Sequence, residues 1–598
     1  MPHVTIAYPR HREGKMDKLL PHYEQELGIL RRASQQFAER HPALARELGM
    51  AADCSADPEV ERLLQSIALL NATTSQRIAA AHEQLTTALL RNTKPHAART
   101  LPSSAVAQID LSGAKARDVV QASRIERGTE FRALTGAVDC RFRNAFDMVL
   151  LPLTLETYRY SQSIDVPSSL QLPSHCAASI EIGLRTTVAG TPLHRNCAMP
   201  LRLYVDAAPQ LRAALFEAIF TRAISVCIES GGTWKVLEQL PFSLPAFDAG
   251  SSLLPPPLDL LTEYFAYPDK FAFLDIDLPA LIHACPLHAE QLRIVIALPD
   301  KRNAAVGRTL KELDAAKLKT GCSPLINLYT VAALPIILTP ERRQYPVVPS
   351  ERSALAAELY AIDSVQLTRK DGEASVTLPR YDGTSHATSS TFWQLRSTDE
   401  GNVIALLDRD GLPAIFDGGI LTVMLTVTDG NVPEALKTGQ AGGDLVIRSS
   451  HTCPIRLLKR PTAPQQKWPD QDQQWQLLSP PRFRTDDTVE ALREILRLHG
   501  GTRDAALVDA IRTLLYMSTS TWHRQEGTSR YLHGMAITVI IDEARSPEHS
   551  MFIFANLLSQ WFRQTSREES FTQLTFLSAT SGDVLVRCQP QSGTRPLI

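Results

Sequence analysis

The sequence lacks the marks of a secreted or membrane-spanning chain. Its opening, MPHVTIAYPRHREGK, has no apolar core followed by a small-residue cleavage site, so we expect no signal peptide. The longest apolar runs, such as VAALPIIL at 331–338, are far shorter than the roughly 20 residues of a spanning helix. We therefore expect a soluble protein that stays in the cytoplasm, without direct membrane insertion.

The sequence also lacks an excess of either charge. Its 598 residues include 62 Lys and Arg against 64 Asp and Glu, a formal net charge of -2. Such a chain has no overall positive field to hold a polyanion, which argues against nucleic acid as the main partner. Hydrophobic residues make up 44% and charged residues 21%, as is typical of a globular protein.

A disulfide framework is not indicated either. The nine cysteines are odd in number and widely spaced, and no C-x-x-C occurs. This pattern favours reduced thiols that pack as small hydrophobic side chains.

Common catalytic and nucleotide-binding motifs are missing. The sequence contains no G-x-x-x-x-G-K-[ST], G-x-G-x-x-G, H-E-x-x-H or G-x-S-x-G. His288 and Glu290 form half of the zinc deaminase pattern, but its P-C-x-x-C half is absent. The acidic pairs in LDID at 274–277 and LLDRDG at 406–411 lack the Gly and Glu of a calcium loop, so we expect them to end strands or turns.

Two groups of histidines and cysteines are the candidates for a zinc site. Neither has the paired ligand spacing of a structural zinc site, which favours buried thiols and edge histidines. We expect no metal and no cofactor. The first group is His283, Cys285 and His288, and the second is His175, Cys176, His194 and Cys197.

Cys322 is the candidate nucleophile. Gly321 before it and Ser323-Pro324 after it predict a tight turn followed by a strand. A reactive thiol needs a nearby base, and no histidine lies within twenty residues in the sequence. A structural role is favoured, while a soluble hydrolase or transferase built around Cys322 or the His283–His288 group stays an alternative.

Two segments near the start have the period of amphipathic helices. Between residues 17 and 41 apolar residues recur at steps of three, four and seven, with charge on the other face. This first stripe comprises Leu20, Tyr23, Leu27, Leu30 and Phe37.

A second helix is predicted to follow, with Asp57 as N-cap and Pro58 as its first residue. We expect the two helices to bury a face against each other, and any remaining face to bind a partner. The second stripe comprises Val60, Leu63, Ile67, Leu70, Thr74, Ile78, Ala81, Leu85 and Leu89.

The rest of the chain reads as an α+β, multidomain protein. Period-two alternation predicts strands from about 104 to 230 and again from 355 to 460, while QLRAALFEAIFTRAISV at 210–226 predicts a helix and QLRIVIALP at 291–299 a buried strand. The last part mixes helices and strands. We expect a helical region at 1–95, a β-rich domain with inserted helices at 96–345, a second β-rich domain at 346–460 and an α+β domain at 461–598.

The order of several segments resembles one protein family. LLPHYEQELGILRRASQQFAERHPALARELG at 19–49, CRFRNAFDMVLLPL at 140–153, LKTGCSPLINLY at 318–329 and MAITVIIDEARSPEHSMFIFANLLSQWF at 535–562 are similar to successive blocks of the TssF family, also called ImpG or VasA. These proteins are baseplate subunits of the bacterial type VI secretion system. The resemblance extends from about Asp17 to Ile598.

This resemblance implies a non-enzymatic assembly protein, similar in architecture to the baseplate wedge proteins of contractile phage tails. It implies two TssF copies joined to one TssG, with TssK and TssE completing a wedge around the VgrG hub, and contacts to neighbouring TssF copies and possibly the Hcp tube. The baseplate would start assembly of the tube and sheath, docked at the inner membrane through the secretion membrane complex. A phage-tail or tailocin wedge protein is the related alternative. We expect the partner contact on the first stripe, at Leu20, Tyr23, Leu27, Leu30 and Phe37.

Overall fold

The computed structural model divides into two compact units, which are described separately. One contains residues 1–98 and 469–480, and the other contains residues 99–468 and 481–598. The structure describes residues 19–47, 58–93, 99–110, 122–133, 139–188, 190–195, 199–255, 260–299, 304–351, 357–369, 375–381, 390–398, 401–447, 453–465, 475, 477–478, 488–500, 504–525 and 528–594.

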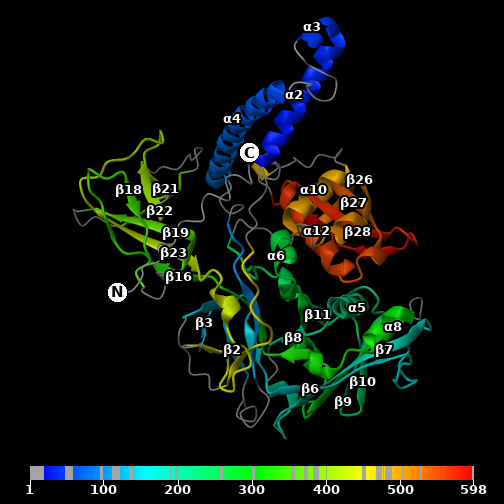
Figure 1. Ribbon diagram of the computed structural model, residues 1–598. Coiled ribbons are helices and arrows are strands. Elements are labelled where there is room, and N and C mark those ends of the chain that lie inside the picture. The colour runs from blue at the N-terminus through cyan, green and yellow to red at the C-terminus, as the bar shows by residue number, and fades with distance from the viewer. Residues whose placement is uncertain are drawn as a thin grey trace, which may run out of the picture. The chain divides into compact units, whose positions relative to one another are not determined.

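The first unit contains the two predicted helices. α2 (Leu20–Arg40) and α4 (Pro58–Thr93) contact each other, and the short α3 (Pro42–Glu47) follows α2 (Figure 1). α4 begins at Pro58 as predicted, and Glu59 and Glu61 in its first turn complement the positive end of the helix dipole. Asp57, the predicted N-cap, lies outside the described residues.

In the second unit, a closed six-stranded barrel collects strands from distant parts of the chain. Around the barrel the order is β1-β15-β4-β3-β24-β25, and Phe131, Phe142 and Leu325 lie in its core. Gly321 has φ of +67° directly before β15, which confirms the predicted turn at this residue, but Ser323 and Pro324 already lie in the strand. The strands are β1 Ser104–Ile109, β3 Glu130–Ala133, β4 Arg141–Asn144, β15 Cys322–Ile326, β24 Leu445–Ile447 and β25 Ile455–Leu457, beside a two-stranded pair of β2 Ser123–Ile125 and β5 Met148–Leu150.

Two further sheets form the middle of this unit, with strand orders β10-β9-β13-β7-β6 and β11-β12-β8-β14. The predicted strand at 291–299 is confirmed as β13, which is flanked by β7 and β9. The strands are β6 Leu153–Ser161, β7 Cys176–Thr186, β8 Leu201–Val205, β9 Ser225–Ser230, β10 Thr233–Leu237, β11 Phe242–Ser243, β12 Phe273–Ile276, β13 Gln291–Pro299 and β14 Leu318–Thr320.

Four short helices accompany these sheets. The helix predicted at 210–226 is too long, because α5 ends at Phe220 and β9 begins at Ser225. The Thr221 hydroxyl donates to the carbonyl of Glu217 at 2.6 Å, which satisfies one of the last carbonyls of α5. The helices are α5 Pro209–Phe220, α6 Leu260–Ala266, α7 Leu278–Ile282 and α8 Ala304–Leu310.

A second β-rich region has its own core, around Val365, Ile404 and Val423. Its sheets have the orders β16-β23-β19-β20, with β17 on β23, and β18-β22-β21. The strands are β16 Tyr329–Ala332, β17 Ile336–Ile337, β18 Gln344–Pro346, β19 Glu358–Thr368, β20 Val376–Thr377, β21 Phe392–Thr398, β22 Gly401–Leu407 and β23 Ile420–Thr428.

The C-terminal region is a sheet of order β26-β27-β28-β29, with β30 on β28. β27 and β28 are parallel and are joined through α12, whose N-cap Ser550 accepts from the amide of Ile553. The elements are α10 Val489–Gly500, α11 Ala505–Ala510, β26 Ile511–Gln525, β27 Thr528–Ile541, α12 Met551–Thr565, β28 Ser570–Ser578, β29 Val584–Arg587 and β30 Gln591–Ser592.

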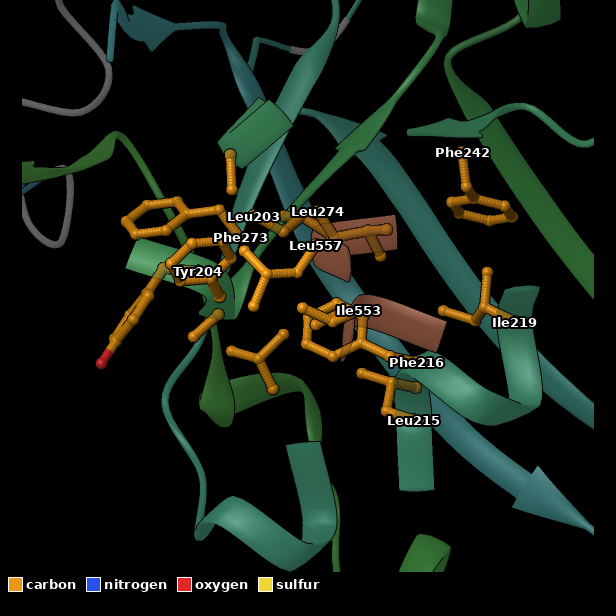
Figure 2. Close-up of a cluster of buried hydrophobic side chains, with 14 of the residues drawn as sticks. Leu203, Tyr204, Leu215, Phe216, Ile219, Phe242, Phe273, Leu274, Ile553 and Leu557 are labelled. Atoms are coloured by element: carbon orange, nitrogen blue, oxygen red, sulfur yellow. The ribbon is translucent and has the colours of Figure 1, made fainter. Parts of the chain in front are cut away.

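The C-terminal and middle regions share one hydrophobic core. Figure 2 shows Ile553 and Leu557 of α12 beside Phe216 of α5. The rings of Phe220 and Phe552 stack with centroids 4.6 Å apart. Together, the helices and the several sheets confirm the predicted α+β class.

Candidate partner-binding surface

The predicted stripe on α2 is largely turned toward the chain's own second helix. Leu20 is 56% exposed, whereas Tyr23, Leu27, Leu30 and Phe37 are half-buried. Glu26, which lies on the same face, accepts a hydrogen bond of 2.7 Å from the Ser75 hydroxyl of α4. The α2 stripe therefore contributes to the hairpin, and Leu20 at its end is the member best placed to meet another protein.

The buried face of α4 consists largely of small side chains, with Leu90 as a large one near its end. Ala68, Ala72 and Thr86 are completely buried on α4, and Ser75 on the same face bonds Glu26. Small residues let two helix axes approach closely. The two helices therefore bury a face against each other, as expected, and most of the large apolar side chains of α4 lie on another face.

Those large side chains form an exposed stripe, which we call the α4 stripe. The pattern repeats every eleven residues. Leu63 is followed by Thr74 and Leu85, Ile67 by Ile78 and Leu89, and Leu70 by Ala81. An eleven-residue repeat has 3.67 residues per turn, so it stays on one face of a nearly straight helix. The exposed fractions are Leu63 62%, Ile67 37%, Leu70 68%, Ile78 66%, Leu85 57% and Leu89 40%.

The length and composition of the α4 stripe fit a protein interface. At 1.5 Å per residue, the stripe from Leu63 to Leu89 is about 39 Å long. Contiguous apolar surface of this kind is rare on monomeric proteins and marks interaction sites. The sequence contained this signal in the eleven-residue spacing, although the prediction placed the partner contact on α2.

Cys322 lies in an environment unlike that of a catalytic thiol. Its side chain is 1% exposed, and its Sγ is 3.4 Å from the carbonyl oxygen of Thr320. Burial raises the pKa of the Cys322 thiol, with a smaller opposing effect from Lys319, and this disfavours the reactive thiolate. The side chain packs in the main hydrophobic core instead.

The two groups of histidines and cysteines are the remaining candidates. In the described part of the chain, no three His, Cys, Asp or Glu residues are grouped to hold a metal. The Cys285 thiol is half-buried and donates to the carbonyl of Leu281 at 3.3 Å. Cys197, a member of the second predicted zinc group, lies outside the described residues.

The acidic pairs do end strands and turns, as predicted. Asp275 in β12 forms a bidentate ion pair with Arg202, whose guanidinium donates to both carboxylate oxygens at 2.8 and 2.7 Å. Asp277 accepts from the amide of Ala280 and caps α7. Asp408 accepts from the amide of Leu412 at 2.9 Å and closes the turn after β22.

Among the described helices, none combines the length and the hydrophobicity that a membrane-spanning segment needs.

Comparison with known proteins gives consistent matches over nearly the whole chain. The family model for the type VI secretion system protein TssF matches residues 15–595. The type VI secretion system component TssF1 of Pseudomonas aeruginosa is 26% identical, over 97% of this chain and 99% of that protein.

Two solved structures have similar folds. A chain of the type VI TssK-TssF-TssG baseplate subcomplex matches with a TM-score of 0.66 and 20% identity, over 90% of this chain and 99% of that one. A chain of the type VI secretion baseplate complex matches with a TM-score of 0.52 and 18% identity, over 97% and 100%. Because the family model covers all but the ends of the sequence, the chain belongs to the TssF family of the type VI secretion system.

Proposed function

We propose that this protein is a structural subunit of the type VI secretion baseplate that acts by binding other subunits and not by catalysis. Its family membership supports this role, and the buried Cys322 thiol weakens the case for the enzymatic alternative. The exposed α4 stripe is the observation that carries the proposal, because its large apolar side chains need a protein surface to cover them.

The proposed direct partners are TssG and TssK. The similar chain of known structure was solved in a subcomplex with these two proteins. By the family resemblance, two copies of this chain would join one TssG. TssE, the VgrG hub and the Hcp tube would complete the assembly in the cytoplasm, docked at the inner membrane through the secretion membrane complex.

We assign the TssG contact to the α4 stripe. A straight apolar row about 39 Å long on one helix is suited to a second long helix running beside it. The small residues Ala68 and Ala72 hold α2 close on another face, which leaves the row open for helices of the partner. A shared helical bundle would then bury the leucines and isoleucines of the stripe.

The test is to place a charge in the middle of the stripe. Leu70→Asp leaves the hairpin contact untouched, because Leu70 is 68% exposed and the face turned to α2 lies elsewhere on α4. In a bundle, however, the aspartate would be buried without a partner, at a cost of several kcal/mol. We expect the variant to be folded by circular dichroism and to lose co-purification with TssG.

Ala80→Asp is the matched control. Ala80 is also exposed on α4 but lies away from both the α4 stripe and the face turned to α2. It adds the same charge to the same helix, so it should retain TssG. Normal TssG binding by Leu70→Asp would refute the assignment of this surface.

A further inference from the structure

The C-terminal sheet ends in a long edge strand. β26 spans 15 residues and, among the residues that the structure describes, pairs only with β27 (Figure 1). Its other side therefore presents a row of backbone amides and carbonyls to solvent. Such an edge is a template for pairing with another strand.

β26 lacks the features that usually block an edge. From Thr513 to His523 it has no charged residue and no proline, and its one irregularity in pairing lies at its start, between Ile511 and Thr513. Natural edges are commonly protected by lysine, proline or a central bulge. Large apolar side chains are exposed on β26 instead: Leu515 is 51%, Met517 67% and Trp522 70% exposed.

In the far half of this hairpin, the described residues contribute two strands. β28 pairs with β27 from His533 to Ile541, so the part of β27 before His533 pairs with β26 and with no other strand of the described chain. Trp522 and Tyr531 form an edge-to-face pair there, with centroids 5.4 Å apart, and both are exposed. A two-stranded ribbon is marginally stable in water and gains from a third strand.

We propose that β26 pairs antiparallel with β26 of a second copy of this chain, around a two-fold axis at Thr519. Self-pairing is electrostatically acceptable, because the segment from Thr513 to His523 has no Asp, Glu, Lys or Arg and extends to both sides of Thr519. Two copies can therefore lie side by side without like charges facing each other, which would oppose pairing. The two sheets would continue as one.

The register follows from the side chains. Centred on Thr519, antiparallel pairing sets Met517 opposite Thr521 and Tyr516 opposite Trp522 of the second copy. Tyr516 is half-buried against the main core on the same side of β26 as Trp522, and an aromatic pair across two strands is favourable. A two-fold axis one residue earlier, at Ser518, would instead set Arg512 opposite Arg524.

Site-specific crosslinking tests this register in the full-length chain. Thr519→Cys brings two identical thiols together at the axis, so a short bismaleimide should link two copies into a covalent dimer. Met517→Cys and Thr521→Cys should each give little dimer alone, but should crosslink when the two variants are mixed. The unmodified chain reports the background of its own cysteines, and Thr575→Cys, two strands away on β28, should not crosslink.

A charge reversal gives an independent readout. Thr519→Lys and Thr519→Glu each place like charges opposite each other at the axis, so each alone should weaken self-association about tenfold. Mixing the two variants should restore it, since lysine then faces glutamate. The double variant Leu70→Asp/Thr519→Cys should crosslink as well as Thr519→Cys alone. This result would show that the β26 contact does not depend on the α4 stripe proposed to bind TssG.

Three results would overturn the proposal. One is the absence of any Thr519→Cys dimer at concentrations where the baseplate subunits associate. Another is crosslinking of Thr519→Cys to a different polypeptide, which would identify a foreign strand as the occupant. The last is self-crosslinking centred on another residue of β26, which would exclude this register.

Discussion

At the scale of single residues, the second unit contains a fully buried ion pair. The side chains of Lys270 and Glu263 are 0% and 1% exposed, and the Lys270 ammonium donates to the Glu263 carboxylate. Glu263 also accepts from the amide of Leu254 at 2.9 Å, which fixes the loop before α6. Burial lowers the pKa of Lys270, and Glu263 opposes that shift. Each charge is tolerated only because of the other.

Removing one charge of this pair should therefore be costly. We expect Lys270→Met to reduce the free energy of unfolding by about 3–5 kcal/mol, because Glu263 is left as an unpaired buried charge. The double variant Lys270→Met/Glu263→Gln should recover much of that loss, since glutamine still accepts from the Leu254 amide. Urea unfolding of the wild type and the variants measures both. Equal stability of the single and double variants would contradict this account.

His549 links the C-terminal and middle regions and should make their contact sensitive to pH. Its Nδ1 is 2.9 Å from the Tyr264 hydroxyl of α6, and its Nε2 is 3.6 Å from Asp504. Burial lowers the pKa of His549, although Asp504 and Glu548 oppose the shift. The unfolded chain then binds a proton more readily than the folded one, so stability is complete above about pH 6.5 and falls as the pH drops toward the lower folded pKa.

Thermal unfolding measured between pH 5 and 8 checks this expectation. The melting temperature should decline below about pH 6.5 in the wild type. His549→Gln keeps a polar side chain that does not titrate, and should flatten the decline in that range. An unchanged decline in the variant would assign the effect to other groups.

At the scale of elements, the apolar stripe of α2 meets the chain's own second helix, whereas the α4 stripe is exposed. The helical periodicity of the sequence is the same for both and did not distinguish them. Both stripes have helical periodicity, and both helices form as predicted. Periodicity identifies an apolar face but does not say what covers it, because own-chain and partner contacts need the same residue types. On α4, small residues form the contact with α2. A search for large apolar residues at helical spacing does not detect them.

Leu27→Asp distinguishes a contact of α2 with α4 from a contact of α2 with a partner protein. Leu27 is half-buried on the face of α2 that meets α4, so the charge should destabilise the hairpin itself, and we expect a loss of about 1–3 kcal/mol and increased protease sensitivity of the first 93 residues. Gln36→Asp, exposed on the opposite face of α2, is the control. Unchanged protease resistance with lost TssG binding would mean that Leu27 meets the partner instead.

The strand β26 shows what the sequence does not reveal. Several strands were predictable because apolar residues alternate along them, as in β1 and β7, or form a continuous apolar run, as in β13. In β26 the segment Ser518–Thr521 is a run of serine and threonine, which hides any alternation. Its edge position depends on pairing between distant segments, which local patterns do not encode.

At the scale of the whole molecule, closure of the barrel depends on pairing between strands that are far apart in the sequence. β24 and β25 join β3 and β1 more than 300 residues after those strands, so the barrel closes only when the end of the second β-rich region returns to it. The resemblance indicated the family from the order of segments, but the closed barrel is a tertiary feature. Contacts of this separation are also expected to make folding slow.

The two ends of the returning region lie together, which leads to a final prediction. The amide of Asp429 donates to Asn327 Oδ1 at 2.7 Å, so the chain leaves and re-enters the barrel at almost the same place. The residues between them form strands with a core of their own, apart from Tyr360 and Ala361, which pack in the main core. We expect that replacing residues 329–427 by a short Gly-Ser linker leaves the barrel, the middle sheets and the C-terminal region folded.

The shortened chain should be soluble and should unfold cooperatively, with only a modest loss of stability from the missing partners of Arg141. That guanidinium lies over the Tyr329 ring and pairs with Glu351 at 2.6 Å, and both residues are removed with the region. A control deletion of β24 and β25 (444–457) removes barrel strands and should abolish folding, because β1 and β3 would each lose a neighbour. If the 329–427 deletion is equally insoluble, the second β-rich region is required for barrel closure and is not an independent insertion.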